Sequence, residues 1–239
     1  MKQSGVSNIE ITTLDGAEIV LEPWSWPFAA ARRGEIDGHF AGLQRKRLGV
    51  WNGRVLLLNR YVIDNGVLRG ACFETDYASF CAWRDWTFPD ASVFNFFAAA
   101  ALRSADGAWL VGEMASDTAN AGLLYFPCGT PELADVDENG RFDLARNLRR
   151  ELLEETGIDP AELVAAPAWS FLRDRGYIAL IKRLTARQGA VELRTRIMRT
   201  IDRQARPELV DIRILRGPAD LDSRLPPFMV AFLEQAWRR

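Results

Sequence analysis

Three glutamates near the middle of the chain have the side-chain type and the spacing for metal chemistry. Glu151, Glu154 and Glu155 lie in the run Arg-Glu-Leu-Leu-Glu-Glu-Thr-Gly-Ile that spans 150–158. On a helix, positions i, i+3 and i+4 share one face, so these negative charges would repel one another. A solvated acidic face is the alternative interpretation of such a run. A hard divalent cation such as Mg²⁺, which takes oxygen ligands and keeps water or phosphate in its shell, would reverse the repulsion.

The whole run resembles the Nudix box, R-E-x-x-E-E-x-G followed by an aliphatic residue. The six matching positions are Arg150, Glu151, Glu154, Glu155, Gly157 and Ile158. The resemblance implies a Mg²⁺-dependent hydrolase that cleaves a pyrophosphate bond in a nucleoside diphosphate derivative, with Mn²⁺ as an alternative metal. It also implies that the three glutamates bind the metal and that Arg150 pairs with one of them. These four side chains are the expected catalytic set.

The first half of the box departs from the family pattern. Gly129 matches the glycine that opens the box, where it would let the backbone approach the metal and the substrate closely. The family has a glutamate six residues after that glycine and eight before the arginine, but these spacings fall on Asp135 and Phe142. The loop is therefore longer than usual, and no single residue satisfies both spacings. The acidic candidates for the missing position are Glu132, Asp135, Asp137, Glu138 and Asp143, the last of which is also a good helix cap.

Water is the expected nucleophile. His39 is the single histidine and lies far away in sequence, so Cys128 or a serine lacks an imidazole base to activate it. Bound metal would offset charge on the phosphate oxygens and make water more acidic, and water would then attack one phosphorus. Many enzymes of this family take their general base from a loop outside the box. The downstream candidates, which the sequence does not rank, are Glu192, Glu208 and Asp211.

The substrate is narrowed less sharply. The turn at 129–131 with its long loop resembles a Nudix subgroup related to UDP-sugar pyrophosphatases, which implies a nucleotide sugar. ADP-ribose or a dinucleotide is the alternative substrate, and a nucleotide-binding protein without turnover is the alternative class. Arg173 and Arg175, in a predicted turn between strands, could bind phosphate, although a solvated loop explains them equally well. Aromatic residues between Tyr77 and Phe88 could stack on a base, but their helical spacing favours core packing.

The elements that must position these residues predict an α/β (α+β) fold. Asp143 is a good N-cap and Gly157 a good C-cap for a helix between them. Strands and helices are mixed on both sides of it, and the resemblance implies a Nudix-type, mixed-sheet α/β/α sandwich. We expect residues 1–92 to form an N-terminal, mostly-β extension and residues 93–239 to form the Nudix hydrolase domain that the resemblance implies. Asp15-Gly16 predicts a hairpin turn between strands at 8–13 and 18–21.

The bulk composition excludes some partners. A formal net charge of −2 over 239 residues gives no electrostatic reason to bind nucleic acid or an anionic membrane. No apolar stretch approaches the length of a membrane span, and no leader pattern opens the chain. Three cysteines without a metal-binding spacing, Cys72, Cys81 and Cys128, fit reduced thiols. We therefore expect a cytoplasmic enzyme for a small molecule, whose N-terminal region caps the site or forms a homodimer contact.

Overall fold

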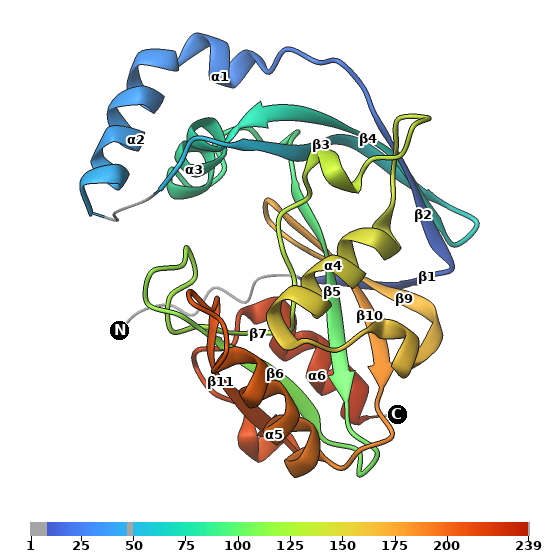
Figure 1. The fold of residues 1–239 in the computed structure, drawn as a ribbon. Coiled ribbons are helices and arrows are strands. Elements are labelled where there is room, and N and C mark those ends of the chain that lie inside the picture. Colours follow the sequence, from blue (N-terminus) through green and yellow to red (C-terminus); the bar gives the residue numbers. More distant parts are fainter. Residues whose placement is uncertain (1–8, 47–49, 239) are drawn as a thin grey trace, which may run out of the picture.

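A computed structural model describes residues 9–46 and 50–238, and within them the chain forms a mixed α/β fold with two mixed sheets (Figure 1). The larger sheet has seven strands in the order β1-β9-β10-β5-β6-β11, with β7 paired to β6. Among the described strands of this sheet, only β5 and β10 run parallel to each other. Its strands are β1 (Glu10–Leu14), β5 (Asn95–Arg103), β6 (Trp109–Met114), β7 (Leu124–Tyr125), β9 (Val164–Asp174), β10 (Tyr177–Thr185) and β11 (Leu209–Leu215).

Helices cover both faces of the larger sheet and give the expected α/β/α sandwich (Figure 1). α4 (Leu144–Thr156) and α5 (Ala190–Ile201) pack on one face, and α6 (Pro227–Trp237) packs on the other. Alternation along β5 divides its side chains between the two cores, because successive strand residues point to opposite faces. Phe96 packs with α4 and α5, whereas Phe97 packs with α6.

The smaller sheet has the strand order β3-β4-β2-β8. Its strands are β2 (Gly16–Leu21), β3 (Arg54–Asp64), β4 (Val67–Asp76) and β8 (Arg141–Phe142). Leu56 and Leu58 of β3 point into the core that also holds α4, while Leu57 points into a separate core on the opposite face. The smaller sheet therefore lies between α4 and the N-terminal helices.

The N-terminal helices are α1 (Pro27–Ala31), α2 (Arg33–Lys46) and α3 (Tyr77–Asp85). The aromatic spacing predicted α3, and that helix is confirmed. The pattern does not predict α2, because Gly34, Gly38 and Gly42 lower its intrinsic helix propensity. Tertiary packing of Ile36 and Phe40 against α3 supplies what propensity lacks.

The predicted hairpin at Asp15-Gly16 is wrong, because its two strands belong to different sheets. β1 pairs antiparallel with β9, whereas β2 pairs with β4 and β8. The Asp15 backbone N–H instead donates to the Gly66 carbonyl at 2.7 Å, in the turn that joins β3 to β4. Asn8, where that hairpin was expected to start, lies outside the described residues. β1 thus adds the N-terminal region to the larger sheet, and a domain boundary at residue 92 stays a prediction.

Short 3-10 helices lie in three loops of the described chain: η1 (Leu133–Asp135), η2 (Pro160–Glu162) and η3 (Pro218–Asp220). Of these, η1 lies within the long loop that precedes α4. Across residues 9–46 and 50–238, none of the helices combines the length and the apolar character that a membrane crossing requires.

Candidate active site

Helix α4 begins and ends where its sequence signals place it. The Asp143 side chain accepts a hydrogen bond from the Arg146 backbone N–H at 2.9 Å. Gly157 adopts φ 69°, a left-handed conformation that closes the helix without a Cβ clash. The helix is anchored through one apolar face, formed by the buried side chains Leu144, Leu148 and Leu152. Packing of this face fixes the direction in which the neighbouring glutamates project.

The three glutamates of α4 differ in their exposure to solvent. Glu151 and Glu155 are buried, with 7% and 5% of their surface exposed. The Glu154 side chain is 62% exposed. Two carboxylates therefore lie one helical turn apart in a region with little water, and the third lies at its rim. Helical spacing indicated the shared face, but the burial of that face depends on the tertiary packing.

The Asp135 carboxylate anchors Arg150 and is the acidic loop residue that lies deepest in the protein. It is fully buried, and its Oδ2 lies 2.9 Å from Arg150 Nη2. The same carboxylate accepts hydrogen bonds from Asn147 Nδ2 at 2.9 Å and from the Glu132 backbone N–H at 3.1 Å. Asn147 is also fully buried and accepts a long hydrogen bond, 3.4 Å, from the Ala98 N–H of β5. This cluster ties the long loop, α4 and β5 together.

The other acidic residues of the loop have different roles. Glu132 lies farther from Arg150, with 3.6 Å between Oε1 and Nε. Asp137 accepts backbone N–H groups of its own turn, Asp143 caps α4, and Glu138 is exposed. Among these residues, Asp135 is the fully buried one that pairs with Arg150, and it lies six residues after Gly129. The extra length of the loop lies between this residue and the helix.

Electrostatics in this region disfavour ionised carboxylates. Burial raises the pKa of Glu151 to about 7, although Arg150 Nη1, 2.7 Å from its Oε1, acts in the opposite direction. The pKa of Glu155 is raised well above its usual value, first by burial and then by the negative charges of Glu151 and Glu208. A hydrogen bond from the Cys128 backbone favours the charged form of Glu155, but it does not offset the other effects.

Gly129 leaves the space that the Glu151 carboxylate occupies. A Cβ at position 129 would lie 2.1 Å from both Cδ and Oε1 of Glu151, so any larger residue would displace the carboxylate. The segment before it is held against β5 by the Ala99–Cys128 bridge and by a 2.9 Å hydrogen bond from the Ala100 N–H to the Pro127 carbonyl. The glycine therefore lets a fixed backbone pass directly beside a carboxylate of the box.

The donor set fits a hard divalent cation. Glu155 Oε1 is buried and has no hydrogen-bond partner, although buried polar atoms normally have one. Glu151 and Glu208 add their negative charge to the same region, and oxygen donors are the ligands that Mg²⁺ prefers. In the described part of the chain, no three acidic, cysteine or histidine side chains already form a metal-binding group. The fit therefore rests on the unpaired oxygen, its burial and the surrounding charge.

Neither Cys128 nor His39 has the environment of a catalytic nucleophile or base. Burial, followed by the charges of Glu155 and Glu151, raises the pKa of the Cys128 thiol well above its usual value, which disfavours the thiolate. His39 Nε2 lies 2.9 Å from Asp85 Oδ2, within the N-terminal helices.

Among the three base candidates, Glu208 is the one whose negative charge raises the pKa values of Glu151 and Glu155. Its own pKa is raised, first by partial removal from solvent and then by the charge of Glu154. Glu192 is exposed in the first turn of α5. Asp211 is held by Arg194 at 2.5 Å and by Arg213 at 3.4 Å. Sequence reasoning could not rank the three, because only the fold brings Glu208, which precedes β11, near the glutamates of α4.

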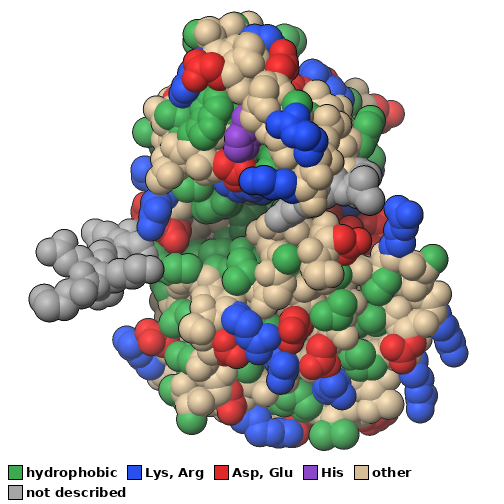
Figure 2. Space-filling view, turned by 90° about the vertical axis from the view of Figure 1, so that its left-hand side faces the viewer, with side chains coloured by type: hydrophobic (Ala, Val, Ile, Leu, Met, Phe, Trp, Pro, Cys, Tyr) green, Lys and Arg blue, Asp and Glu red, His purple; other side chains and the backbone are tan. Residues whose placement is uncertain are grey.

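A cavity of about 420 Å³ opens beside Gly129, at the junction of α3 with the larger sheet. Figure 2 shows a hollow lined by hydrophobic side chains beneath the N-terminal helices. α3 contributes Tyr77 and Phe80 to the wall, and Cys128 and Gly129 form the part nearest the carboxylates. The N-terminal region thus supplies one wall of this cavity.

Two arginines that the sequence did not single out line the cavity. Arg84 belongs to α3, and its Nε lies 2.9 Å from Asp85 Oδ1. Arg224 precedes α6 and binds Asp222 at 2.8 Å and Glu113 at 3.0 Å. Their positions could not be read from a motif, because isolated arginines in a charged chain carry no pattern.

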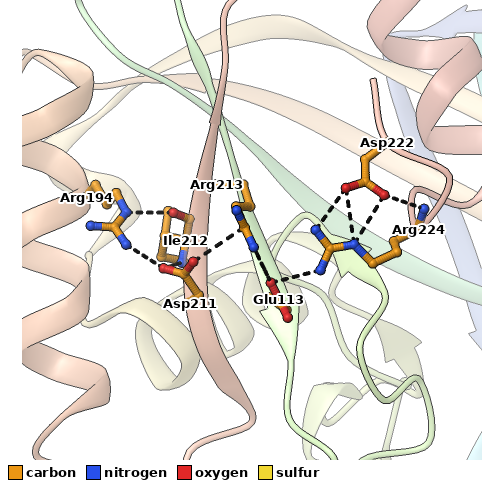
Figure 3. A network of polar contacts seen from close by, with 7 residues as sticks. All are labelled: Glu113, Arg194, Asp211, Ile212, Arg213, Asp222 and Arg224. Atoms are coloured by element: carbon orange, nitrogen blue, oxygen red, sulfur yellow. Dashed lines mark hydrogen bonds and ion pairs between the residues drawn. The ribbon is translucent and has the colours of Figure 1, made fainter. Parts of the chain in front are cut away.

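Figure 3 shows how Arg224 is fixed in a chain of ion pairs. Glu113 of β6 also binds Arg213 at 3.2 Å, and Arg213 in turn contacts Asp211 of β11. Arg194 of α5 completes the chain by binding Asp211 and the Ile212 carbonyl. The network links α5, β11, β6 and the loop before α6. Asp211 is part of it, because both Arg194 and Arg213 bind its carboxylate.

The predicted phosphate ligands Arg173 and Arg175 do not line the cavity. Arg173 Nη1 lies 3.8 Å from Glu10 Oε2, and its guanidinium lies 5.2 Å from the centroid of the Phe94 ring. It precedes the lining residue Asp174, and successive strand side chains point to opposite faces. Arg175 is exposed in the β9–β10 turn with φ 51°.

Comparisons with known proteins add a distant similarity. No family model matches the chain, and no curated protein matches it. Among solved structures, it is similar to the MutT protein from Methanosarcina mazei Go1, with 18% identity, a TM-score of 0.39, and coverage of 61% of this chain and 94% of that one. It is also similar to RenU, a Nudix hydrolase from M. smegmatis, with 16% identity, a TM-score of 0.40, and coverage of 61% and 87%.

A third similar structure is a bifunctional NMN adenylyltransferase/ADP ribose pyrophosphatase from Francisella tularensis, complexed with AMP and a manganese ion. The identity is 15%, the TM-score is 0.38, and the match covers 60% of this chain and 42% of that one. At these scores the similarity assigns neither a family nor an activity to the chain.

Proposed function

We propose that the protein is a Nudix-type hydrolase that uses Mg²⁺ to cleave the pyrophosphate bond of a nucleoside diphosphate derivative. The observation that carries this proposal is the buried, unpaired Glu155 Oε1, which lies in a region that also holds the charges of Glu151 and Glu208. A buried unpaired carboxylate oxygen costs free energy, and a bound cation supplies the missing partner. A purely structural helix has no use for this arrangement.

The proposed metal ligands are Glu151, Glu154 and Glu155. Glu208 adds its negative charge to the same region but is not one of the proposed ligands. Two of the ligands are buried and one reaches solvent, which leaves one side open to a substrate. When bound, Mg²⁺ or Mn²⁺ would supply positive charge that offsets the charge of the phosphate oxygens and makes water more acidic. The remaining chemistry belongs to side chains of the protein.

Arg150 and Asp135 act as positioning residues in this proposal. Their 2.9 Å ion pair fixes the long loop against α4, and Arg150 also contacts Glu151 at 2.7 Å. Gly129 keeps the backbone beside Glu151 clear of any side chain. These contacts hold the ligand carboxylates in place before substrate binds, which is how a preorganised site lowers the barrier.

Glu208 is the proposed general base, because it is the base candidate whose charge reaches the box carboxylates. It would take a proton from water as the water oxygen bonds to one phosphorus and the bond from that phosphorus to the bridging oxygen breaks. The bridging oxygen leaves with the other phosphate. The products are two monophosphates, one of which carries the nucleoside.

The cavity beside Gly129 supports a substrate larger than a simple diphosphate. Its volume of about 420 Å³ lies within the range of small-molecule sites, and its nearest wall is the segment that contacts Glu151. We propose a nucleotide sugar as the substrate. ADP-ribose or a dinucleotide is the alternative substrate. The two monophosphates that are released identify which substrate was cleaved.

The test is a Mg²⁺-dependent hydrolysis screen across UDP-sugars, ADP-sugars, ADP-ribose, NAD(H) and dinucleoside polyphosphates, with products separated by chromatography. Loss of a metal ligand in Glu155→Gln should lower turnover by roughly three orders of magnitude, or about 4 kcal/mol of transition-state stabilisation. Glu234→Gln is the matched control, because that glutamate lies on α6 with a side chain that is 46% exposed. Unchanged turnover in Glu155→Gln would refute the metal site. No turnover across the panel would instead favour a nucleotide-binding protein without catalysis.

A further inference from the structure

Asn95 is a buried amide in the wall of the cavity, and its side-chain oxygen has no partner. It is the first residue of β5 and is 7% exposed. Its Oδ1 is buried without a hydrogen bond. Its backbone N–H is used, because it donates to the Gly176 carbonyl at 2.8 Å. The side-chain carbonyl is therefore the unsatisfied group at this position, and buried carbonyls are rarely left in that state.

The direction of the Asn95 side chain follows from its strand. Side chains two residues apart on a strand share a face, so Asn95 lies on the same face as Phe97, which packs with α6. Both residues line the cavity, and so does Tyr177, which pairs directly with Asn95 in β10. The amide is thus directed into a cavity whose nearby walls are aromatic.

The cavity suits a flat, uncharged group. Aromatic side chains line it from separate elements, including Tyr77 and Phe80 of α3 and Phe228 of α6. Its arginines are already paired with acidic side chains: Arg84 with Asp85, and Arg224 with Asp222 and Glu113. A phosphate would have to compete with those carboxylates. Planar heterocycles of any kind can stack on aromatic rings through their π-faces. The aromatic lining therefore favours a heterocycle over an anion.

We infer that this cavity binds the nucleobase of the substrate and that Asn95 is a specificity-determining residue, which accepts a hydrogen bond from an N–H group on the edge of the base. An asparagine amide presents a donor beside an acceptor, which matches the edges of nucleobases. The inference rests on the proposed function for its account of the rest of the substrate. Gly129 lines the cavity and contacts Glu151, so a diphosphate attached to a base in the cavity would extend toward the box carboxylates.

The test measures binding without catalysis. Isothermal titration calorimetry in EDTA compares AMP, GMP, UMP and CMP with ribose 5-phosphate, which has the sugar and the phosphate but no base. At least one nucleotide should bind roughly tenfold more tightly than ribose 5-phosphate. Asn95→Leu should weaken that nucleotide roughly tenfold, as expected for loss of a hydrogen bond to a buried site, and should leave ribose 5-phosphate unchanged.

Asn59→Leu is the matched control. Asn59 also has a buried, unpartnered Oδ1, but it lies on β3 and does not line the cavity. The Asn59→Leu variant should bind every compound as the wild type does. Asn95→Ala is the second variant, to be used if leucine prevents folding. Thermal unfolding of Asn95→Leu should occur at no lower a temperature than in the wild type, because an unsatisfied buried group is removed.

Equal binding of ribose 5-phosphate and all four nucleotides, or wild-type nucleotide binding by both Asn95 variants, would overturn the inference. The result is separable from the hydrolysis screen. Nucleotide binding that depends on Asn95, in a protein without hydrolytic activity, would refute the proposed function and keep the base site. Hydrolysis together with binding that does not depend on the base would support the proposed function and refute the base site.

Discussion

Arg150→Met should destabilise the protein more than any exposed arginine substitution on the same helix. The substitution keeps a long apolar stem but removes the cation that faces Asp135 at 2.9 Å. Asp135 is fully buried, so its carboxylate would be left without a countercharge. Removing one partner of a buried ion pair typically costs about 3–5 kcal/mol, because the remaining charge stays desolvated. For a chain of this size, that loss lowers Tm by roughly 10 °C.

The hydrogen bonds to Asp135 reduce this cost without abolishing it. Asn147 Nδ2 and the Glu132 backbone N–H would remain as donors after the substitution. Neither carries a charge, and neutral donors contribute about 0.5–1.5 kcal/mol each. We therefore expect about 3 kcal/mol, the lower end of the range.

Urea unfolding followed by tryptophan fluorescence measures the change in the free energy of unfolding. A double-mutant cycle shows how much of that change comes from the Arg150–Asp135 pair. Asp135→Asn removes the buried charge, so Arg150→Met should cost at least 1 kcal/mol less in the Asp135→Asn background than in the wild type. Arg149→Met is the matched control. That arginine is 61% exposed and pairs with Asp159 at 2.7 Å, so its loss should cost no more than about 1 kcal/mol. Equal effects of the two arginine substitutions, or strictly additive effects in the cycle, would refute the reasoning.

Two further predictions concern the same site. Gly129→Ala should lower hydrolysis at least tenfold, because a Cβ there would lie 2.1 Å from the Glu151 carboxylate, whereas Gly38→Ala, with nothing within 4 Å, should keep wild-type turnover in the same assay. The pKa of Glu151 is about 7 in the folded protein, above its usual 4.5, so the folded state holds this proton more tightly than the unfolded chain does. In EDTA, the stability of the wild type relative to Glu151→Gln should therefore fall by about 3 kcal/mol as pH rises from about 4.5 to 7. Added Mg²⁺ should raise wild-type stability more at pH 8 than at pH 5, and an equal effect of Mg²⁺ at both values in urea unfolding would contradict the assignment.

Local signals determined the helix that carries the candidate site. Asp143 and Gly157 predicted α4 with its ends, because helix capping depends on residues close together in the chain. The three glutamates were visible for the same reason.

Partnerships between distant segments were decided by the tertiary structure. The sequence left five acidic candidates for one position of the box, and only the fold brings Asp135 to Arg150 and buries both Glu151 and Glu155. The hairpin predicted at Asp15-Gly16 failed because β1 pairs with the distant strand β9, whereas β2 pairs with β4 and β8 in the other sheet.

The residues that line the cavity could not be predicted either, because their positions also depend on contacts between distant segments. Arg173 and Arg175 were chosen for their type and turn context, yet strand alternation and the turn leave them off the cavity that Arg84, Arg224 and Asn95 line. A pattern of residue types records local preference, whereas burial and an unsatisfied side-chain oxygen arise from contacts between segments far apart in the chain. The sequence by itself thus determined helix α4 and its three glutamates, and the tertiary structure decided which side chains surround them and which are left without a partner.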